Sequence, residues 1–458
     1  MKSSLSEIKS WLSGAYLTAD AAFEGVSTNS KAVQAGNLFI ALRGERFDAH
    51  DFIAEVAAAG AAAVIVEKAP KDSSIPALVV PDTRVALREL GQSWRRQFSF
   101  PVVGVTGSNG KTTVKEMIAA ILAAEYGEGN YLATRGNLNN DLGVPLTLLR
   151  ANASHKAAVI EMGMNHPGEI ALLSAIAQPT IGLVNNAQRE HLEFMHSVEA
   201  VARENGAVIS SLPTDGIAVF PADDTYAGLW KANAKASGKR KILGFGLSGD
   251  ASVTCSYQPT ENGSDMQVKV GDKSFPLRLS VFGAHNVRNA LAAIACGLAL
   301  GIRRNVIVRA LEGFAPVSGR LQRKTGKSGA VVIDDTYNAN PDSVRAAIDV
   351  LALAQAPRML VLGDMGEVGS EGRQFHTEIG AYARGRGIEH LFTLGELAIH
   401  ASGAFGARAR HANDMEELKQ AVAALATANS TVLVKGSRFM KMERVVQHLC
   451  DKPMKESH

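Results

Sequence analysis

Short apolar runs recur along the chain, and most of them end in a polar or glycine-containing stretch. The runs occupy residues 38–42, 62–66, 77–80, 101–105, 157–160, 180–184, 330–333, 359–362 and 431–434. Between several of them the apolar positions follow helical spacing instead, as at residues 52–59, 83–98 and 114–122. Strands that alternate with helices are typical of proteins with parallel sheets. The pattern therefore predicts an α/β fold.

The length of 458 residues exceeds what one hydrophobic core usually serves and predicts about three domains. We expect a small N-terminal α/β domain at residues 1–100 and a central domain with a parallel sheet and a P-loop ATPase site at residues 101–316. A third domain, residues 317–458, has the pattern of a Rossmann-like, doubly wound sheet. No phosphate loop follows its first strand, which disfavours a second nucleotide-binding core.

Composition narrows the class of protein. Hydrophobic residues make up 46% and charged residues 20%, which excludes a disordered or fibrous chain. The net charge of +3 requires no nucleic-acid partner. The first residues lack the apolar segment of a signal peptide, and no run of about 18 apolar residues occurs, so we expect no membrane insertion. Three widely spaced cysteines fit a reducing compartment, and together these features predict a cytoplasmic enzyme.

Residues 106–113, TGSNGKTT, lie between a predicted strand and a predicted helix. This arrangement, here called the phosphate loop, can cradle phosphate because backbone N–H groups and the helix dipole favour an anion there. Gly107 and Gly110 permit the turn, Lys111 can reach the outer phosphates, and Thr112 can coordinate Mg²⁺. Only two residues separate Gly107 from Gly110, fewer than the common spacing, and an ordinary strand-to-helix turn is the alternative.

Polar residues at the ends of the next strands extend this prediction. Glu161 ends one strand, and His191 lies beyond the end of the next. Carboxyl ends of parallel strands face the ligand crevice, so Glu161 is a candidate Mg²⁺ ligand opposite Thr112, and His191 joins that site. A salt bridge is the alternative for Glu161, and a structural role is the alternative for His191.

Amide and arginine side chains supply further candidates. Asn286 and Asn289 share one face at the start of a helix and can contact a ligand, although Asn286 could instead cap it. Arg320, at a domain junction, could reach a transferring phosphoryl group or lie on the surface. Arg43 and Arg46 flank a glycine in a loop that could bind an anion or simply be solvated.

Two further expectations concern the C-terminal region. A helix begins near residue 341, and we expect Asp342 or Ser343 to cap it. Residues 364–367 and 435–438 each follow a predicted strand, so we expect them at a surface that closes over the ligands.

Taken together, these stretches resemble the Mur ligases of peptidoglycan synthesis. The similar stretches are FIALRGERFDAHDF, TGSNGKTTVKEM, TRGNLNNDLGVPLTLL, IEMGMNHPGEI, GAHNVRNALAA, DDTYNANPDS, LGDMGEVG and VKGSR. They run through all three predicted domains. GNLNNDLGVPLTLL and DDTYNANP are similar to the branch of the family that adds D-alanyl-D-alanine.

The resemblance implies a reaction. ATP would phosphorylate the terminal carboxylate of UDP-MurNAc-tripeptide, and the amine of D-Ala-D-Ala would attack the acyl phosphate to give UDP-MurNAc-pentapeptide, ADP and phosphate. ATP and Mg²⁺ are the implied cofactors, and we expect a cytoplasmic monomer. This chemistry needs a charge clamp on the γ-phosphate rather than a covalent enzyme nucleophile.

The resemblance also assigns residues. Lys111, His191 and Arg320 are the implied catalytic residues, and Thr112, Glu161 and His191 the implied Mg²⁺ ligands. ATP would be bound by Gly107, Ser108, Asn109, Gly110, Lys111, Thr112, Thr113, Asn286 and Asn289 near adenine, Arg320 at the phosphates, Asp335 at ribose and Tyr337 against the base. The substrates would be bound by Thr28, Ser30, Arg43, Gly44, Arg46, Asn137, Asn139, Asn140, Asn338 and Asn340.

One position departs from the family pattern. Many Mur ligases carry a carbamylated lysine that helps to hold a second Mg²⁺, and their Lys-Gly-Glu stretch corresponds here to Asn205-Gly206-Ala207. An amide cannot form a carbamate, which puts the second metal in doubt. The neutral oxygen of Asn205 could coordinate a metal directly or through water.

Two other functions stay open at this point. The chain could be another amide ligase of the same superfamily, such as a diaminopimelate- or lysine-adding Mur ligase or a folylpolyglutamate synthetase; GNLNN and the NAN of DDTYNANP argue against this. It could also be a nucleotide-dependent regulatory module without ligase activity. The third residue of the acceptor peptide does not follow from the sequence.

Overall fold

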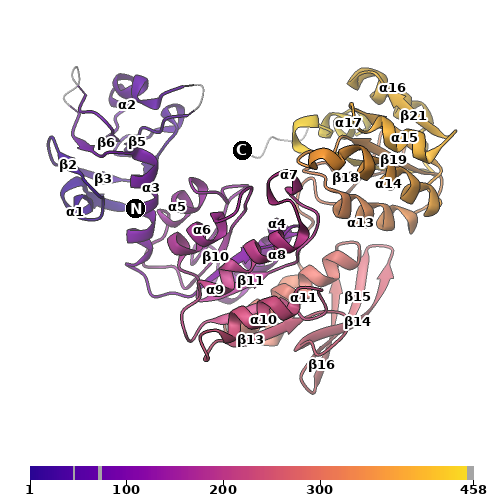
Figure 1. Cartoon of the computed structure of the whole chain (residues 1–458), viewed down its shortest axis with the longest axis horizontal. Helices are drawn as coiled ribbons and strands as arrows, with labels where there is room; N and C mark the ends of the chain where they lie inside the picture. Colours follow the sequence, from indigo (N-terminus) through magenta and orange to yellow (C-terminus); the bar gives the residue numbers. More distant parts are fainter. Residues whose placement is uncertain (45–46, 71–74, 451–458) are drawn as a thin grey trace.

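The structure is a computed structural model that describes residues 1–44, 47–70 and 75–450. Within these residues the chain forms a series of sheets, which define an N-terminal, a central and a C-terminal unit (Figure 1). The N-terminal unit has the strand order β2-β7-β6-β5-β4, and β1 pairs with β3 beside it. The bounds are β1 Lys2–Ser4, β2 Tyr16–Leu17, β3 Ala22–Glu24, β4 Val26–Ser27, β5 Leu38–Ile40, β6 Ala63–Val66 and β7 Ala77–Val79, with helices α1 Leu5–Lys9, η1 Ser30–Ala32, η2 Ala49–Phe52 and α2 Ile53–Ala58.

Helix α3, Thr83–Arg95, joins the N-terminal unit to the central unit. It begins at Asp82, whose side chain accepts from two backbone N–H groups. Near its other end, Trp94 donates to the carbonyl of Ala151, and the buried Arg95 donates to that of Ala177. Gly91 allows close packing, because a Cβ there would lie 2.5 Å from the Cβ of Pro145. Helix α3 therefore belongs to both units.

The central sheet has the order β16-β15-β14-β13-β12-β11-β8-β10-β9. Its strands are β8 Val102–Thr106, β9 Tyr131–Ala133, β10 Ala157–Glu161, β11 Ile181–Val184, β12 Ile217–Pro221, β13 Lys241–Phe245, β14 Val253–Thr260, β15 Gly263–Val270 and β16 Lys273–Leu279. Strands β8 to β14 run parallel, whereas β15 and β16 extend the sheet in antiparallel register. The sequence predicts β8, β10 and β11 among them, but not β9, β12, β13 or β14. The chain order reverses beside β8, which is where ligands bind in such sheets.

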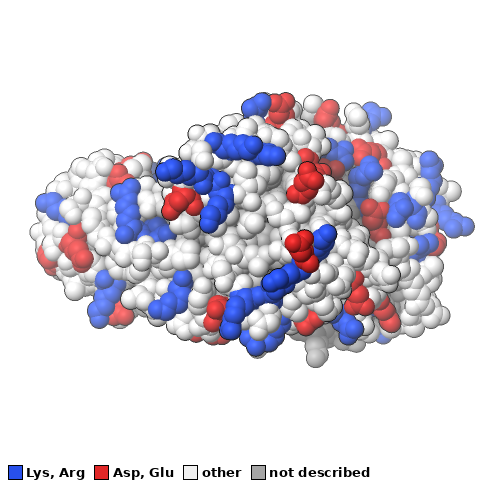
Figure 2. All heavy atoms as spheres, turned by 90° about the horizontal axis from the view of Figure 1, so that it is seen from below, with Lys and Arg blue, Asp and Glu red and all other residues white. Residues whose placement is uncertain are grey.

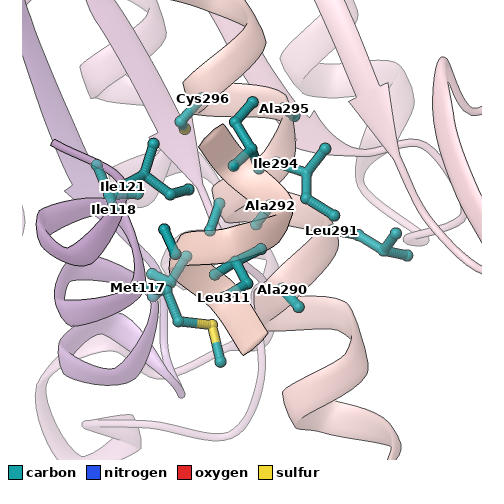
Figure 3. Packing of buried hydrophobic residues seen from close by; sticks show 14 of the residues in the cluster. Met117, Ile118, Ile121, Ala290, Leu291, Ala292, Ile294, Ala295, Cys296 and Leu311 are labelled. Carbon is teal, nitrogen blue, oxygen red and sulfur yellow. The ribbon is translucent and has the colours of Figure 1, made fainter. Parts of the chain in front are cut away.

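The helices of the central unit cover both faces of its sheet. They are α4 Lys111–Tyr126, α5 Gly143–Leu148, α6 Glu169–Ala177, α7 Leu192–Met195, α8 Val198–Asn205, α9 Ala207–Ser210, α10 Ala227–Lys235, α11 Ala284–Ala299 and α12 Arg304–Glu312. Figure 3 shows Met117 and Ile121 of α4 packed with Ile294 of α11 and Leu311 of α12, all fully buried. Burying a side chain of this size contributes roughly 1.5–3 kcal/mol. This packing fixes α4, which begins at the phosphate loop.

The C-terminal unit has the strand order β17-β18-β22-β19-β20-β21, with only β17 antiparallel to its neighbour among these strands. Its strands are β17 Gln322–Thr325, β18 Val331–Asp335, β19 Arg358–Gly363, β20 His390–Leu394, β21 Ala409–Ala412 and β22 Thr431–Lys435. Its helices are α13 Pro341–Ala352, η3 Gly369–Glu371, α14 Gly372–Gly385, α15 Ile399–Phe405, α16 Met415–Leu425, η4 Arg438–Met440 and α17 Glu443–Leu449. Separate apolar clusters on the two faces make it a doubly wound sheet.

One sequence expectation about this unit is wrong. The cap of α13 is Asn340, not Asp342 or Ser343. Its side chain accepts from the N–H of Ser343, and the Ser343 hydroxyl accepts from the N–H of Asn340, so the two form a capping box. Pro341 occupies the first helical position, so the capping residue is the one directly before it, Asn340.

The surface carries both signs of charge. On the face shown in Figure 2, basic and acidic side chains are interspersed. Among the described helices, none is both long enough and apolar enough to cross a membrane.

Candidate active site

The phosphate loop begins at the end of β8 and leads into α4. Gly107 has φ 133° and Gly110 has φ 80°, in the region that favours glycine. A Cβ at Gly110 would lie 2.5 Å from Oδ1 of Asn289, so the close approach also requires glycine. Gly110 caps α4 without a side chain, which leaves the first N–H groups of a long helix free of a side-chain cap. The predicted anion cradle is therefore present.

Lys111 folds back over this loop. Its Nζ donates to the carbonyls of Gly107 and Ser108, at 2.5 and 3.1 Å, and lies 2.9 Å from Oε1 of Glu190. The other oxygen of Glu190 is buried and has no partner among the described residues. Lys111 is thus held by neutral carbonyls and one carboxylate, which a phosphate could replace as its partner.

Glu161 lies at the end of β10 and is only 2% exposed. Its Oε1 accepts from the Thr112 hydroxyl at 3.3 Å and from Nδ2 of Asn139 at 2.8 Å. Its Oε2 is buried without a partner in the described part of the chain. An unpaired buried carboxylate oxygen is costly unless something binds it. Glu190 has such an oxygen as well, and carboxylate oxygens of this kind are the ligands that Mg²⁺ prefers.

His191 is an expected Mg²⁺ ligand, and in the structure both of its ring nitrogens lie near carboxylates. Its Nδ1 lies 2.7 Å from Oε2 of Glu367 in the C-terminal unit, and its Nε2 lies 3.6 Å from Oε1 of Glu190. Within the described residues no cluster of three or more His, Cys, Asp or Glu side chains is arranged to hold a metal. The structure thus brings Thr112 and Glu161 into contact, while His191 has Glu190 beside one ring nitrogen and Glu367 beside the other.

Arg189 ties the same segment to the C-terminal unit. Its guanidinium lies 2.6 Å from Asp342 and 2.8 Å from Glu378, and it stacks 5.3 Å from the centre of the Phe375 ring. Arg189 and His191 therefore both contact the C-terminal unit, and Glu190 between them contacts Lys111 of the phosphate loop. Movement of the C-terminal unit would therefore displace Arg189 and His191, and with them Glu190 beside the phosphate loop.

Arg320 also comes from the chain beyond the central unit. Its Nη2 donates to the hydroxyl of Thr112 at 3.1 Å, and its guanidinium lies 4.1 Å from the ring centre of Tyr337. Its Nε is buried without a partner in the described residues. Nearby, Lys435 lies 2.6 Å from Oδ2 of Asp335. Cationic groups from two units thus converge on the phosphate loop.

Lys111, Thr112, Glu161, Glu190, His191 and Arg320 line one large cavity of about 910 Å³ between the units. Its wall includes the phosphate loop, residues 137–141, the ends of β10 and β11, the start of α11 and the segment around Tyr337. Arg84 and Arg88 of α3 line it as well. The cavity can hold a nucleotide together with an extended second ligand.

Comparison with known proteins shows which family has this arrangement. Three family models match: the Mur ligase family catalytic domain at residues 22–94, the Mur ligase middle domain at 105–297 and the Mur ligase glutamate ligase domain at 319–438. UDP-N-acetylmuramoyl-tripeptide–D-alanyl-D-alanine ligase of Escherichia coli (strain K12) is 39% identical over 97% of this chain and 98% of its own length. The chain belongs to the Mur ligase family.

Solved Mur ligase structures share the fold over nearly the whole chain. A crystal structure of MurF from Acinetobacter baumannii matches with a TM-score of 0.90 at 34% identity and covers 97% of this chain and 98% of that one. MurF ligase from Thermotoga maritima in complex with ADP matches with a TM-score of 0.81 at 28% identity, over 93% and 96%. A structure named UDP-N-acetylmuramoylalanyl-D-glutamyl-2,6-diaminopimelate–D-alanyl-D-alanyl ligase, also from Acinetobacter baumannii, has a TM-score of 0.85 at 33% identity, over 97% and 98%.

The two asparagines of α11 form a buried chain of amides in this Mur ligase. Asn185 donates to Oδ1 of Asn289 at 2.8 Å, and Asn289 donates to Oδ1 of Asn286 at 3.0 Å. Asn286 in turn donates to the carbonyl of Phe282, while Gly283 is the residue that caps the helix. The alternative that Asn286 caps α11 is therefore wrong. Both asparagines line the cavity, where they remain candidates for nucleotide contact.

Asn205 is the residue expected at the position of the family's carbamylated lysine. Its side chain is buried, and Oδ1 accepts from the backbone N–H of Gly107 at 2.9 Å. This amide oxygen is therefore committed to the phosphate loop. In this Mur ligase the residue therefore positions the backbone of the phosphate loop.

The predicted substrate residues fall into two groups. Asn137, Asn139, Asn140, Asn338 and Asn340 line the cavity. Asn140 also stabilises the turn before α5 by accepting from Gly143, and Asn340 donates to Oδ1 of Asn109 across the units. Thr28, Ser30, Arg43 and Gly44 lie in the N-terminal unit and do not line this cavity, and Arg46 lies outside the described residues.

Sequence reasoning missed Glu190, Arg189 and Lys435 as site residues. Glu190 could have been suspected because it precedes His191 at the same sheet edge. Arg189 gave no signal, since its partners Asp342 and Glu378 lie far along the chain. Lys435 ends β22, and its position was expected only at a closing surface; Asp364, from the other expected segment, instead accepts from the backbone of Leu397 and Ala398.

Proposed function

We propose that this Mur ligase uses ATP to join D-alanyl-D-alanine to the terminal carboxylate of UDP-MurNAc-tripeptide. The products are UDP-MurNAc-pentapeptide, ADP and phosphate. The proposal follows the names of its full-length relatives and one structural observation. Arg320 of the C-terminal unit donates to Thr112, and this places a positive charge at the phosphate loop of the central unit.

The cavity supports activation of a carboxylate by phosphate transfer. Lys111 and the free N–H groups of α4 would hold the outer phosphates, and Arg320 would offset the charge that develops on the transferred group. Thr112, Glu161, Glu190 and the Nε2 side of His191 would hold Mg²⁺, which neutralises charge between the phosphates. Nucleotide binding would replace the Lys111–Glu190 contact.

The second half of the reaction forms the amide. The acyl phosphate carries a good leaving group, so an amine can attack its carbon, and the tetrahedral intermediate collapses with release of phosphate. The amine nitrogen loses a proton as the amide forms. Water would compete as a nucleophile, and the contacts of Arg189 and Glu367 hold the C-terminal unit over the site.

The three units would divide the ligands between them. We assign the UDP end of the acceptor to the N-terminal unit, residues 1–100, with Thr28, Ser30, Arg43, Gly44 and Arg46 near it. Residues 101–316 would bind the ATP phosphates, and residues 317–458 would supply Asp335 and Tyr337 for the nucleoside. Since Arg320 stacks on one face of the Tyr337 ring, a base would use the other face.

A phosphate-release assay tests the proposal. Purified protein with ATP, Mg²⁺ and UDP-MurNAc-tripeptide should release phosphate with D-Ala-D-Ala, and not with L-Ala-L-Ala, with single amino acids or without an amine. Lys111→Ala should abolish release, whereas Lys231→Ala, at an exposed position on α10, should not. Release with diaminopimelate, lysine or glutamate instead would identify another amide ligase of the superfamily. ATP binding without release under any condition would indicate a regulatory module.

Two further expectations concern the oligomeric state and the location of the ligase. We expect the ligase to act as a monomer in the cytoplasm, where ATP and nucleotide-linked precursors are available. Light scattering at assay concentrations and fractionation of cells would test both.

A further inference from the structure

Two arginines of α3 converge on one carboxylate at the wall of the cavity. Arg84 and Arg88 are one helical turn apart, so they share a face of the helix. Arg84 places Nε 2.6 Å from Oδ2 of Asp141 and Nη2 2.8 Å from Oδ1, and Nε of Arg88 lies 3.1 Å from Oδ2. The Arg84 side chain is 54% exposed, that of Arg88 27% and that of Asp141 16%. The arginines are thus open to the cavity, and Asp141 is largely covered by them.

This group has more donors than its carboxylate can use. A guanidinium has five N–H groups, and Asp141 engages Nε and Nη2 of each arginine. Nη1 of neither arginine has a partner within the described part of the chain. Two other carboxylates lie nearby, but Asp82 accepts from the first N–H groups of α3 and Glu169 accepts from Asn165 and His166. Unused charged donors therefore remain at the cavity wall.

The position of the arginines relative to the phosphate loop is fixed by a short stretch of chain. Asn139 donates to Glu161, which accepts from Thr112 at the start of α4. Asp141, two residues after Asn139, holds the arginines. Two residues span at most about 7 Å. Glu161, Arg84 and Arg88 thus line the same cavity, and residues adjoining an acceptor carboxylate bound beside Glu161 come within reach of the two arginines.

We propose that Arg84 and Arg88 bind a carboxylate of the acceptor peptide other than the one that is activated. This rests on the proposed function. The acceptor named for the Acinetobacter baumannii relative contains D-glutamyl and 2,6-diaminopimelate residues, which bring such extra carboxylates. The planar guanidinium matches a carboxylate bidentately, and helix α3 lies between the N-terminal unit and the phosphate loop, on the path of an acceptor that spans them.

Kinetics with matched variants test the site. Arg84→Gln and Arg88→Gln should each raise KM for UDP-MurNAc-tripeptide at least tenfold, and should raise it far more than KM for ATP or D-Ala-D-Ala. Arg96→Gln is the control, because Arg96 is exposed at the end of the same helix and does not line the cavity. Equal losses for all three substrates, together with a lower melting temperature, would show a structural tether between the units and overturn the proposal.

Modified acceptors identify which carboxylate is bound. One acceptor has its glutamyl carboxylate amidated, and another has lysine in place of diaminopimelate. The proposal expects one of them to have a raised KM with the wild-type enzyme, and expects Arg84→Gln to bind that acceptor and the unmodified one about equally. If UDP alone loses affinity in the variants as much as the full acceptor does, the arginines bind the diphosphate and the proposal is wrong.

A binding experiment separates this proposal from the proposed function. Calorimetry of UDP-MurNAc-tripeptide with the full chain, without ATP or dipeptide, measures the site even if no turnover occurs. Tighter binding to the wild type than to Arg84→Gln would support the site whether or not the chain ligates D-Ala-D-Ala. Equal binding would overturn the site and leave the ligase activity to be judged from phosphate release.

Discussion

The imidazole of His191 faces the carboxylate of Glu367 across the junction between the central and C-terminal units, with Nδ1 2.7 Å from Oε2. Both residues have a left-handed backbone, with φ 49° and 58°. Such conformations cost about 1–3 kcal/mol for residues other than glycine and persist where the surrounding structure holds them. Glu367 also accepts from the N–H of Glu193 at 3.5 Å through its carbonyl. These contacts place the Glu367 carboxylate beside the His191 ring, so we expect the C-terminal unit to orient it.

Replacing Glu367 by Gln should weaken the metal site without unfolding the protein. A carboxylate on one ring nitrogen directs the other nitrogen toward a ligand, and losing such a partner typically costs 10–100-fold in metal affinity or activity. We expect the Mg²⁺ concentration for half-maximal phosphate release to rise about tenfold. Glu371→Gln, an exposed site nearby in η3, is the control. An unchanged Mg²⁺ dependence would mean that Glu367 does not orient His191.

Replacing Arg189 by Met should loosen the junction. The substitution removes the pairs with Asp342 and Glu378, and it replaces the cation–π contact with Phe375 by an apolar side chain. We expect a lower kcat and a larger radius of gyration by small-angle scattering, and a coupling of about 0.5–3 kcal/mol with Asp342→Asn in a double-mutant cycle. Arg203→Met is the control, since Arg203 pairs with Glu199 within one exposed helix turn. Compact scattering with normal kcat in Arg189→Met would contradict this role.

Stability should fall at acid pH partly through Asp141. Burial alone would raise the pKa of Asp141, but hydrogen bonds from Arg84 and Arg88 outweigh it and lower the pKa from 3.8 to about 2. Because the folded-state pKa lies below the unfolded value, this stabilisation is present above about pH 4 and is lost as the pH falls toward 2. After allowance for partial exposure we expect about 1 kcal/mol.

Chemical unfolding at pH 5 and pH 2.5 would measure this contribution. Asp141→Asn should show a smaller drop in unfolding free energy between the two pH values than the wild type. Asp250→Asn, at an exposed position, should behave as the wild type. Equal drops in all three proteins would show that Asp141 contributes no pH-dependent stability.

Gly110→Ala should damage nucleotide binding more than an ordinary glycine substitution. Its φ of 80° strains any L-residue, and the new Cβ would meet Asn289 and Asn185. We expect ATP affinity to fall at least tenfold and the melting temperature to drop, as followed by calorimetry and thermal unfolding; roughly 1.4 kcal/mol corresponds to the tenfold change. Gly228→Ala in α10, where nothing lies within 4 Å of the new Cβ, should leave ATP affinity unchanged and should not lower the melting temperature. Normal ATP binding by Gly110→Ala would show that the loop can re-form around the side chain.

Much of the fold follows from local sequence. The apolar runs predict the parallel strands because such strands are buried on both faces, and the α/β class and the Mur ligase family are confirmed. The apolar runs do not predict the antiparallel strands β15 and β16, because strands that alternate buried and exposed positions contain no continuous apolar run. The cap of α13 differs from the expected residues because proline favours the first helical position, so Pro341 makes Asn340 the capping residue.

The site was predictable only where its contacts are local or follow from a shared sheet edge. Glu161 could be placed near Thr112 because β10 and β8 are neighbours. The pairs His191–Glu367 and Arg189–Asp342 join residues more than 150 positions apart, and they depend on how two units are oriented. The spacing of apolar and polar residues along the chain does not indicate how the central and C-terminal units are oriented. The individual ligand contacts of Thr28, Ser30, Asn338 and the other assigned residues, and the domain boundaries, stay predictions.

Helix α3 has a consequence for the size of the acceptor. It is about 20 Å long, and both of its ends are fixed, one in the N-terminal unit and the other by Trp94 and Arg95 on the central unit. The N-terminal and central units are therefore joined by a helix rather than by a flexible linker. Under the proposed function, an acceptor held by its uridine end in the N-terminal unit would meet the phosphates at a constant distance. One peptide residue adds about 3.5 Å, so we expect a peptide one residue shorter or longer to be a poorer acceptor.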